Sequence, residues 1–247
     1  MKLVYALLVT FGILLFGFST AHATPDWHDS YGDLLSKYVT PQGVKYSQWK
    51  ANPQDLQALN DISKRLANDP IDTSSPQAAI AYLSNAYNIF VLMGVLDRYP
   101  IRSVQEIAPA FGFFSQKRFV LNKTKVSLNQ IEKKFLLKQY REPRIHFIIN
   151  CASISCPALP TSSLTAANLE QMMETSTRRY ITSSPEGLAY SPDNPSSAKA
   201  SQVFDWYSKD FVSYGGIRAF LNRYLESPIP KSTKIGFLKY NWDLNEI

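Results

Sequence analysis

The spacing of apolar positions along the chain predicts two neighbouring helices in its first half. Residues 55–68 carry apolar side chains every three or four positions, as on one face of an α-helix: Leu56, Leu59, Ile62 and Leu66. The segment 77–98 contains no proline and is apolar nearly all round, which is typical of a helix buried in the middle of a domain. Ser75 is a good N-cap for that helix, and Pro76 suits its first turn.

The middle of the chain changes to patterns that favour strands. Residues 117–128 (KRFVLNKTKVSL) alternate well enough to predict a hairpin that turns at 122–123. Ser127 and Gln130 then form an S-x-x-Q capping box, which predicts the start of another helix. Residues 144–150 (RIHFIIN) are mostly apolar, so we expect a strand that is covered on both faces.

Helical patterns return toward the C-terminus. Residues 165–181 predict an amphipathic helix, residues 203–212 and 217–225 two shorter helices, and residues 234–240 a closing strand. Helices therefore dominate both ends, with strands in the middle. We expect one α+β domain over residues 24–247, rich in helix, with a small central mixed or antiparallel sheet.

The first 23 residues have the pattern of a secretory signal peptide. Lys2 precedes an uncharged run over residues 3–18, and a small-residue Ala-His-Ala site ends the segment at 21–23. The alternative is an uncleaved membrane anchor, because the apolar run approaches spanning length. We expect cleavage, a periplasmic or secreted protein, and no integral membrane segment in the mature chain.

Charge and composition exclude several functions. The chain has a formal net charge of +6, but its basic residues are scattered, so we read them as solvated surface and expect no nucleic-acid partner. With only 10 glycines and no phosphate-binding or dinucleotide fingerprint, the chain predicts no cofactor. The partner is then an unidentified small molecule, peptide or protein.

The candidate chemistry gathers in residues 144–160 (RIHFIINCASISCPALP). This stretch contains both cysteines of the chain, Cys151 and Cys156, and one of its three histidines, His146. The pair can form a disulfide, supply a reactive thiol, or remain as inert buried thiols. An oxidising compartment favours the disulfide, which we expect. Two cysteines and one nearby histidine give at most three ligands without zinc-finger spacing, so we expect no metal.

The reactive-thiol interpretation needs a base beside a cysteine, because the thiolate is the nucleophile. His146 is the realistic base, and Arg144 adds positive potential. A strand, however, would separate His146 from Cys151 by roughly 16 Å at about 3.3 Å per residue. Contact between them requires the chain to turn back sharply near Asn150, after which Cys156 reaches His146 more easily.

Other polar groups have two readings each. Asn85 and Asn88 share one face of the predicted helix 77–98, where they either tie it to neighbouring backbone or orient a base and an oxyanion. Glu132 lies beside two lysines, so it is either a solvated side chain or a site carboxylate. We retain Arg144, Asn88 and Asn150 as candidate binding residues.

Six stretches resemble, in order, the domain-of-unknown-function family 547 (DUF547), whose members include bacterial exported proteins: LLSKYVTPQGVKY, AYLSNAYNIFVL, VSLNQIEKKFL, EPRIHFIINCASISCPALP, VFDWYSKDF and IGFLKYNWDLN. The resemblance implies a shared fold, and it supports Glu132 as a site carboxylate because the family keeps a glutamate there. The chain departs from the pattern at Leu83, where the family often has tryptophan, and at Lys133, where it often has histidine. The resemblance implies no activity.

Two functional hypotheses follow. The first is a thiol-dependent hydrolase or transferase acting on amide or peptide bonds, with Cys151 as nucleophile, His146 as base, Glu132 orienting the base and Asn85 contributing to an oxyanion hole. The second is a non-enzymatic periplasmic binding or accessory module, in which a Cys151–Cys156 disulfide holds the loop as a rigid contact surface.

Overall fold

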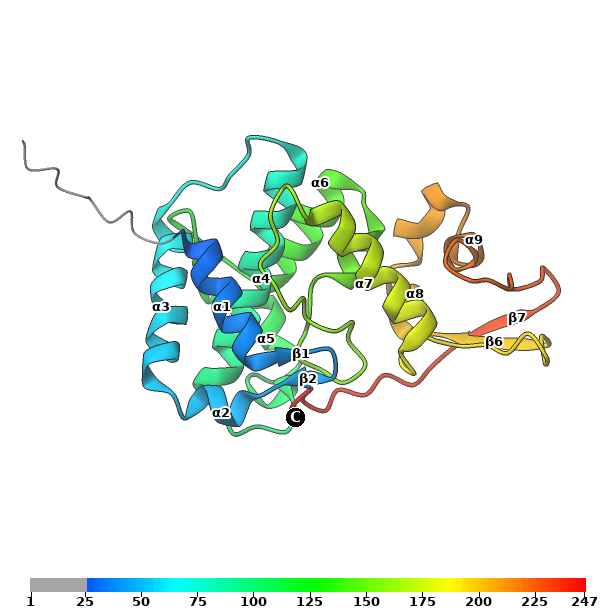
Figure 1. The fold of residues 1–247 in the computed structure, drawn as a ribbon, viewed down its shortest axis with the longest axis horizontal. Helices are drawn as coiled ribbons and strands as arrows, with labels where there is room; N and C mark the ends of the chain where they lie inside the picture. The colour runs from blue at the N-terminus through cyan, green and yellow to red at the C-terminus, as the bar shows by residue number, and fades with distance from the viewer. Residues whose placement is uncertain (1–25) are drawn as a thin grey trace, which may run out of the picture.

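The longest helix, α4 (Pro76–Arg98), runs through the middle of the domain in the computed structural model, which describes residues 26–247 (Figure 1). As predicted, the Ser75 hydroxyl caps the helix, accepting from the backbone N–H of Ala78 at 3.0 Å. The helix is long and apolar enough to cross a membrane, but its apolar stretch is buried inside the protein, where it forms the core. The predicted signal peptide, residues 1–23, lies outside the described residues.

Helices pack around α4 from several sides. α3 (Pro53–Asn68) packs on it and buries Leu59, Ile62 and Leu66, three of the four apolar positions that predicted this helix. α1 (Trp27–Tyr38) covers α3, and α2 (Tyr46–Lys50) contacts both α3 and α4. On other sides α4 contacts η2 (Gln130–Leu137) and α7 (Leu169–Ser183). This packing makes α4 the scaffold of the domain.

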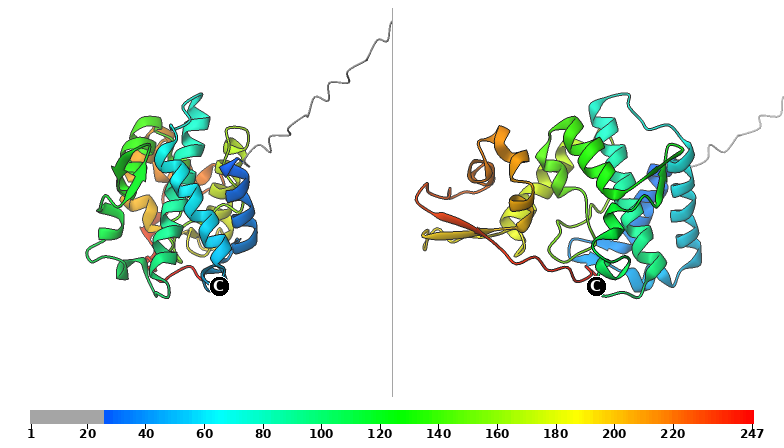
Figure 2. Two further views of the ribbon diagram at one scale, coloured as in Figure 1. Left: turned by 90° about the vertical axis from the view of Figure 1, so that its left-hand side faces the viewer. Right: turned by 180° about the vertical axis from the view of Figure 1, so that it is seen from behind.

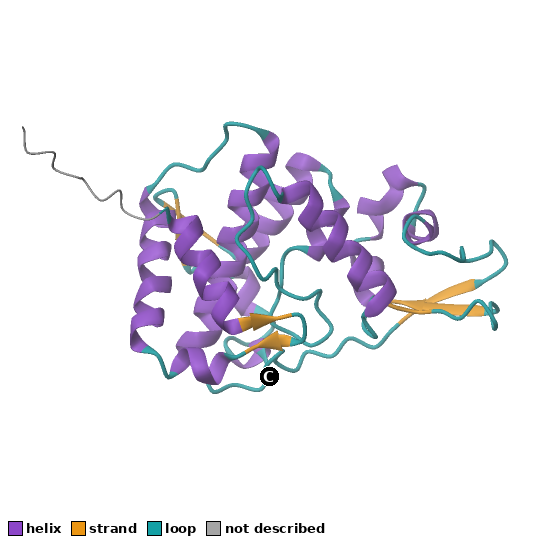
Figure 3. Cartoon of the chain, in the orientation of Figure 1, coloured by secondary structure: helices purple, strands orange, loops and turns teal. Residues whose placement is uncertain are grey.

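The other helices are short: α5 (Gly112–Ser115), α6 (Lys138–Tyr140), α8 (Gln202–Trp206), α9 (Ile217–Asn222), and the 3-10 helices η1 (Val104–Glu106), η3 (Pro143–Phe147) and η4 (Ser208–Tyr214). Within residues 26–247, three small sheets accompany them: β1 (Val39–Thr40) with β2 (Gly43–Val44), β3 (Phe119–Leu121) with β4 (Thr124–Val126), and β5 (Leu188–Ala189), β6 (Ser197–Ala200) and β7 (Lys234–Phe237). The α+β class is confirmed, and the three-stranded sheet is mixed and lies at one end of the domain (Figure 3).

The predicted hairpin and capping box are both present. β3 and β4 pair antiparallel around a turn at 122–123. The Ser127 backbone N–H donates to the Gln130 side chain at 3.1 Å, and the Gln130 backbone N–H donates to the Ser127 hydroxyl at 3.1 Å. The helix that follows, η2, is π-helical, a wider winding that is often found at functional sites. Its residue Glu132 is buried.

The strand predicted for residues 144–150 is wrong. Pro143–Phe147 form the 3-10 helix η3, with the Glu142 carboxylate accepting from the Arg144 backbone N–H at 2.9 Å as its cap. Residues 148–150 pair with a side chain instead of a strand. The Asn88 amide donates to the Ile148 carbonyl and accepts from the Asn150 N–H, both at 2.9 Å. One amide on α4 therefore satisfies the backbone that a sheet would have satisfied.

η3 lies between two hydrophobic cores. Ile145 and Ile148 belong to the main core around α4. Phe147 belongs to a smaller aromatic core under the C-terminal elements: Tyr180, Phe204, Phe211, Phe220 and Tyr224. Its ring is 6.0 Å from that of Phe220, in a stacked arrangement. Both cores therefore hold η3 in place, and His146 lies at their junction.

The C-terminal segment, residues 240–247, returns from β7 to the other end of the domain and finishes beside β1 and β2 (Figures 1 and 2). Between these two ends, the segment forms backbone hydrogen bonds with residues 152–154. The Ile154 backbone N–H donates to the Asp243 carbonyl at 2.8 Å, and the Asn245 backbone N–H donates to the Ala152 carbonyl at 3.2 Å. The end of the chain therefore supports the segment that carries both cysteines.

Candidate functional site

The cysteine loop, residues 151–156, is closed by the side chain of Asn150. This amide donates to the Pro157 carbonyl and accepts from the Ala152 backbone N–H, both at 2.7 Å. Ala152 has φ 61°, a left-handed conformation that turns the chain back directly after Cys151. The sharp turn near Asn150 that a contact between His146 and Cys151 would require is therefore present, but it joins the two cysteines instead.

The predicted disulfide is not formed in the structure, where Cys151 and Cys156, both within the described residues, are free thiols. Instead, the Cys151 backbone N–H donates to Sγ of Cys156 at 3.0 Å. The loop keeps its shape through the Asn150 amide and the C-terminal segment, so a covalent staple is not needed to hold it.

Several donors surround the sulfur of Cys151. Sγ lies 3.0 Å from the Ser153 hydroxyl and 3.2 Å from the Tyr240 hydroxyl. Burial raises the pKa of the Cys151 thiol, but hydrogen bonds from Cys156, Ser153 and Tyr240 outweigh it and hold that pKa below its ordinary value. Burial, together with the neighbouring Cys151, raises the pKa of Cys156 well above its ordinary value. Cys151 is therefore the more nucleophilic of the two cysteines near neutral pH.

Cys151 opens into a cavity of about 430 Å³. His146 and Glu132, two further catalytic candidates, line the same cavity, and so does Cys156. These side chains come from a loop, a 3-10 helix and a π-helical segment, and packing against α4 and the C-terminal elements brings them to one cavity. The sequence hypothesis grouped three of these residues, and the structure brings them together.

His146 is oriented by a carboxylate that the sequence reasoning missed. Its Nε2 lies 2.9 Å from Oδ2 of Asp210 in η4. Because a carboxylate accepts, Nε2 carries the proton of this hydrogen bond, and in the neutral imidazole the lone pair is then on Nδ1. Nδ1 makes no hydrogen bond within residues 26–247. Asp210 thus has the role that the sequence hypothesis gave to Glu132.

Glu132 has a different partner, Tyr207. The Tyr207 hydroxyl donates to Oε1 of Glu132 at 2.5 Å, and its ring centroid lies 4.2 Å from that of His146. Burial, reinforced by the negative charge of Glu132, raises the pKa of Tyr207, so this hydroxyl keeps its proton. Glu132 and His146 therefore contact the same tyrosine, on the cavity wall.

No hydrogen bond joins Cys151 to His146, although both of these described residues line the cavity. The thiol is activated by its own neighbours, and the imidazole is oriented separately by Asp210. The sulfur and the imidazole both border the cavity in which a ligand would lie. This arrangement suits a nucleophile and a proton carrier that act on different atoms of one substrate.

Two groups of aromatic side chains shape the cavity. Tyr87 of α4 is buried in its wall, and its hydroxyl makes no hydrogen bond within the described part of the chain. Burial raises the pKa of Tyr87 well above its ordinary value, so the hydroxyl remains a donor. At the rim, the Trp242 ring lies 4.6 Å from that of Tyr240 and 5.8 Å from that of Trp206, which is 47% exposed. The rim offers flat apolar surface to a ligand.

Asn85 is not part of this cavity. Its amide donates to the Leu164 carbonyl at 2.8 Å and accepts from the Leu164 N–H at 3.1 Å, so it ties α4 to the segment before α7. Nearby, His28 Nδ1 lies 3.1 Å from the Ser163 hydroxyl. The oxyanion role predicted for Asn85 has no support from this position, whereas Tyr87, two residues further along α4, lines the cavity.

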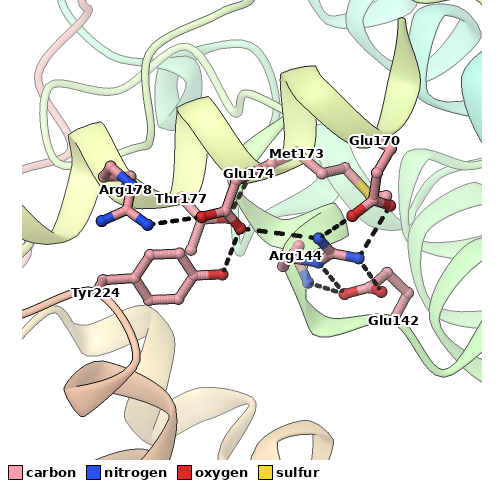
Figure 4. A network of polar contacts seen from close by, with 8 residues as sticks. All are labelled: Glu142, Arg144, Glu170, Met173, Glu174, Thr177, Arg178 and Tyr224. Carbon is pink, nitrogen blue, oxygen red and sulfur yellow. Dashed lines mark hydrogen bonds and ion pairs between the residues drawn. The ribbon is translucent and has the colours of Figure 1, made fainter. Parts of the chain in front are cut away.

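The three candidate binding residues, Asn88, Asn150 and Arg144, hold neighbouring segments of the fold together. Asn88 and Asn150 hold residues 148–157 in place, as described above, and neither lines the cavity. Arg144 forms ion pairs with Glu142 at 2.8 Å and with Glu170 of α7 at 2.6 Å (Figure 4). Hydrogen bonds to these carboxylates raise the pKa of Arg144 against the opposing effect of burial. Arg144 therefore attaches η3 to α7 and does not face Cys151.

The chain is therefore an α+β domain in which a thiol, an imidazole and a carboxylate line one cavity. Residues 71–181 match the family described as Protein of unknown function, DUF547, so the resemblance predicted from the sequence is confirmed over these residues. The match includes Cys151, His146 and Glu132. Tyr207, Asp210 and the aromatic rim lie beyond it. Neither a curated protein nor a solved structure matches the chain.

Proposed function

We propose that this protein is a thiol-dependent enzyme that cleaves or transfers acyl groups at amide or peptide bonds, with Cys151 as its nucleophile. One observation carries the proposal: an activated thiol shares a cavity with a histidine that a carboxylate orients. A cysteine, a histidine and an orienting acid are the parts that acyl transfer through a thioester requires.

In the proposed reaction the Cys151 thiolate attacks the carbonyl carbon, and the carbonyl oxygen becomes negatively charged. We assign the donor to that oxygen as the hydroxyl of Tyr87, which lines the same cavity. Collapse of the tetrahedral intermediate expels the amine and leaves a thioester on Cys151. The amine takes the proton that the Cys151 thiol gave up through cavity water to Nδ1 of His146 when the thiolate formed. The neutral imidazole then takes a proton from water, the water oxygen attacks the thioester, and the acid is released as Cys151 leaves as a thiolate, which recovers the proton from the imidazolium.

Asp210 and Glu132 act through their neighbours in this scheme. Asp210 fixes the tautomer and direction of the His146 ring and stabilises its charged form. Glu132 holds the Tyr207 ring against His146. Both are positioning residues, because neither has to touch the reacting atoms.

The test uses an activated ester such as p-nitrophenyl acetate with the purified chain. We expect a burst of nitrophenol, an acetyl group on Cys151 in the mass spectrum, and slow release of that group. Cys151→Ala should abolish the adduct, and His146→Asn should slow its release. Acetylation without any preference for Cys151 would contradict the proposal. Ligand binding without turnover would instead support the binding module, with a loop held by Asn150 rather than by a disulfide.

We also propose that the protein is exported, on the strength of the pattern in residues 1–23. Export would place the cavity in the periplasm or outside the cell.

A further inference from the structure

The two cysteines are arranged as a nucleophile with a second thiol behind it. Cys156 Sγ accepts a hydrogen bond from the backbone N–H of Cys151 at 3.0 Å, which holds the second sulfur beside the first cysteine. Both side chains line the 430 Å³ cavity and are only partly covered. An acyl-transfer enzyme needs one nucleophilic thiol, so its chemistry uses Cys156 only to stabilise the Cys151 thiolate and does not require the second group to be a thiol.

The loop between them is held without a disulfide. The Asn150 amide joins its two ends, and the Ser155 backbone N–H donates to the Asn241 carbonyl at 3.2 Å. A bond between the cysteines would therefore add little to the shape of the loop. The loop already holds the Cys156 sulfur 3.0 Å from the backbone nitrogen of Cys151, so the two thiols that would form the bond lie in one turn.

We propose that Cys151 and Cys156 carry out thiol–disulfide exchange with a peptide or small-molecule disulfide in the cavity, with Cys151 attacking and Cys156 resolving. This inference rests on the same nucleophile as the proposed acyl transfer and adds a second substrate class. The aromatic rim of Trp206 and Trp242 would hold apolar groups that flank the substrate disulfide.

The substrate disulfide is itself the oxidant in this exchange, so no other electron acceptor is needed. The Cys151 thiolate attacks one substrate sulfur, a mixed disulfide forms, and the other substrate sulfur leaves as a thiolate. Cys156 then gives up its proton and attacks Sγ of Cys151, which releases the second substrate thiol and leaves a Cys151–Cys156 disulfide. The substrate gains two electrons and two protons, one proton from Cys156 and one from solvent. A small thiol reverses both steps and restores the pair.

Oxidised glutathione is the probe for this exchange. The reduced full chain is mixed with it, quenched in acid and analysed by intact mass and peptide mapping. We expect the wild type to lose two hydrogen atoms and keep no glutathione, with the new bond between the two cysteines. Cys156→Ser should stop at one glutathione on Cys151. In Cys151→Ser, we expect Cys156 to react at least about tenfold more slowly, because it is the less ionised thiol.

A stable glutathione adduct on the wild type, or equal reaction rates at the two cysteines, would overturn the inference. Circular dichroism of each variant, with Cys156→Ala as a second substitution, separates loss of resolution from loss of fold. Acetylation of the reduced wild type is measured in parallel. If acetylation occurs but disulfide exchange does not, this inference alone is overturned. If exchange occurs but acetylation does not, only the proposed acyl transfer is overturned.

Discussion

The backbone N–H of Cys151 donates a hydrogen bond to Sγ of Cys156 at 3.0 Å, so two thiols that are five positions apart in the sequence share one turn. The turn depends on the left-handed conformation of Ala152 and on the side chain of Asn150. This turn affects the reactivity of both cysteines. One thiol stabilises the charge of the other, and both are open to the same cavity.

The reactivity of Cys151 should depend on Tyr240. The thiolate fraction grows as pH rises, so a lowered pKa moves the midpoint of alkylation below the ordinary thiol value of about 8.5. Tyr240→Phe removes one donor to the sulfur, which raises that pKa and shifts the midpoint to higher pH. We expect labelling by iodoacetamide at pH 7 to slow by about tenfold, the equivalent of about 1.4 kcal/mol.

The control for this experiment is Tyr190→Phe, because the Tyr190 hydroxyl donates to the Pro228 carbonyl on the exposed surface. It should leave the pH profile unchanged. Identical profiles for the Tyr240 variant and the wild type would show that Tyr240 does not stabilise the thiolate.

Asp210→Asn should impair proton transfer by His146 while leaving the thiol reactive. The variant keeps the size of the side chain but loses the charge that stabilises the imidazolium. We expect deacylation of acetyl-Cys151 to slow by about 10²-fold with a changed pH profile, while alkylation of Cys151 stays at the wild-type rate.

Asp205→Asn is the matched control, because Asp205 lies in α8 and accepts from the Gln202 side chain at an exposed position. A variant at Asp210 that deacylates as fast as the control, with the same pH profile, would remove Asp210 from the proposed mechanism.

The helices could be predicted because their signals are local. α4 is marked by Ser75 and Pro76 at its start and by apolar side chains on every face. The capping box at Ser127 and Gln130 is equally local. Such features depend on neighbours within four residues, so one sequence is enough to find them.

The shape of residues 144–150 could not be predicted, because their partner is distant in the sequence. Asn88 supplies the hydrogen bonds that a neighbouring strand would have supplied. The same limit applies to the site. Cys151, His146 and Glu132 could be proposed from residue type, but Asp210 is 64 positions from His146 and no sequence motif links the two.

Asn150→Ala should destabilise the fold and open the cysteine loop. The substitution leaves the Pro157 carbonyl and the Ala152 N–H without the partners they have now. Leaving buried polar groups unpaired costs about 2–3 kcal/mol, which should appear as a lower midpoint of urea unfolding. Asn194→Ala, in an exposed loop, should change stability by no more than about 0.5 kcal/mol. Equal midpoints for the two variants would mean that Asn150 does not hold the loop.

The export proposal predicts a mature N-terminus at Thr24. Residues 21–23 provide the small side chains that signal peptidases accept. N-terminal sequencing of the full-length gene product from the periplasm or medium should begin at Thr24. A chain that keeps Met1 and stays with the membrane would favour the uncleaved anchor instead.

Arg144→Met should weaken the attachment of η3 to α7 without changing the thiol. Arg144 contacts Glu142 and Glu170 with a side chain that is only 14% exposed (Figure 4), and the substitution leaves both carboxylates without their cation. We expect a loss of about 1–3 kcal/mol in the free energy of unfolding.

Arg178→Met is the matched control, since Arg178 pairs with Glu174 at 2.8 Å but is 53% exposed, and exposed pairs contribute about 0–1 kcal/mol. Alkylation of Cys151 should proceed at the wild-type rate in both variants, because neither arginine lines the cavity. Slower alkylation in folded Arg144→Met alone would show that the positive potential of Arg144 reaches the thiol, as the sequence first suggested.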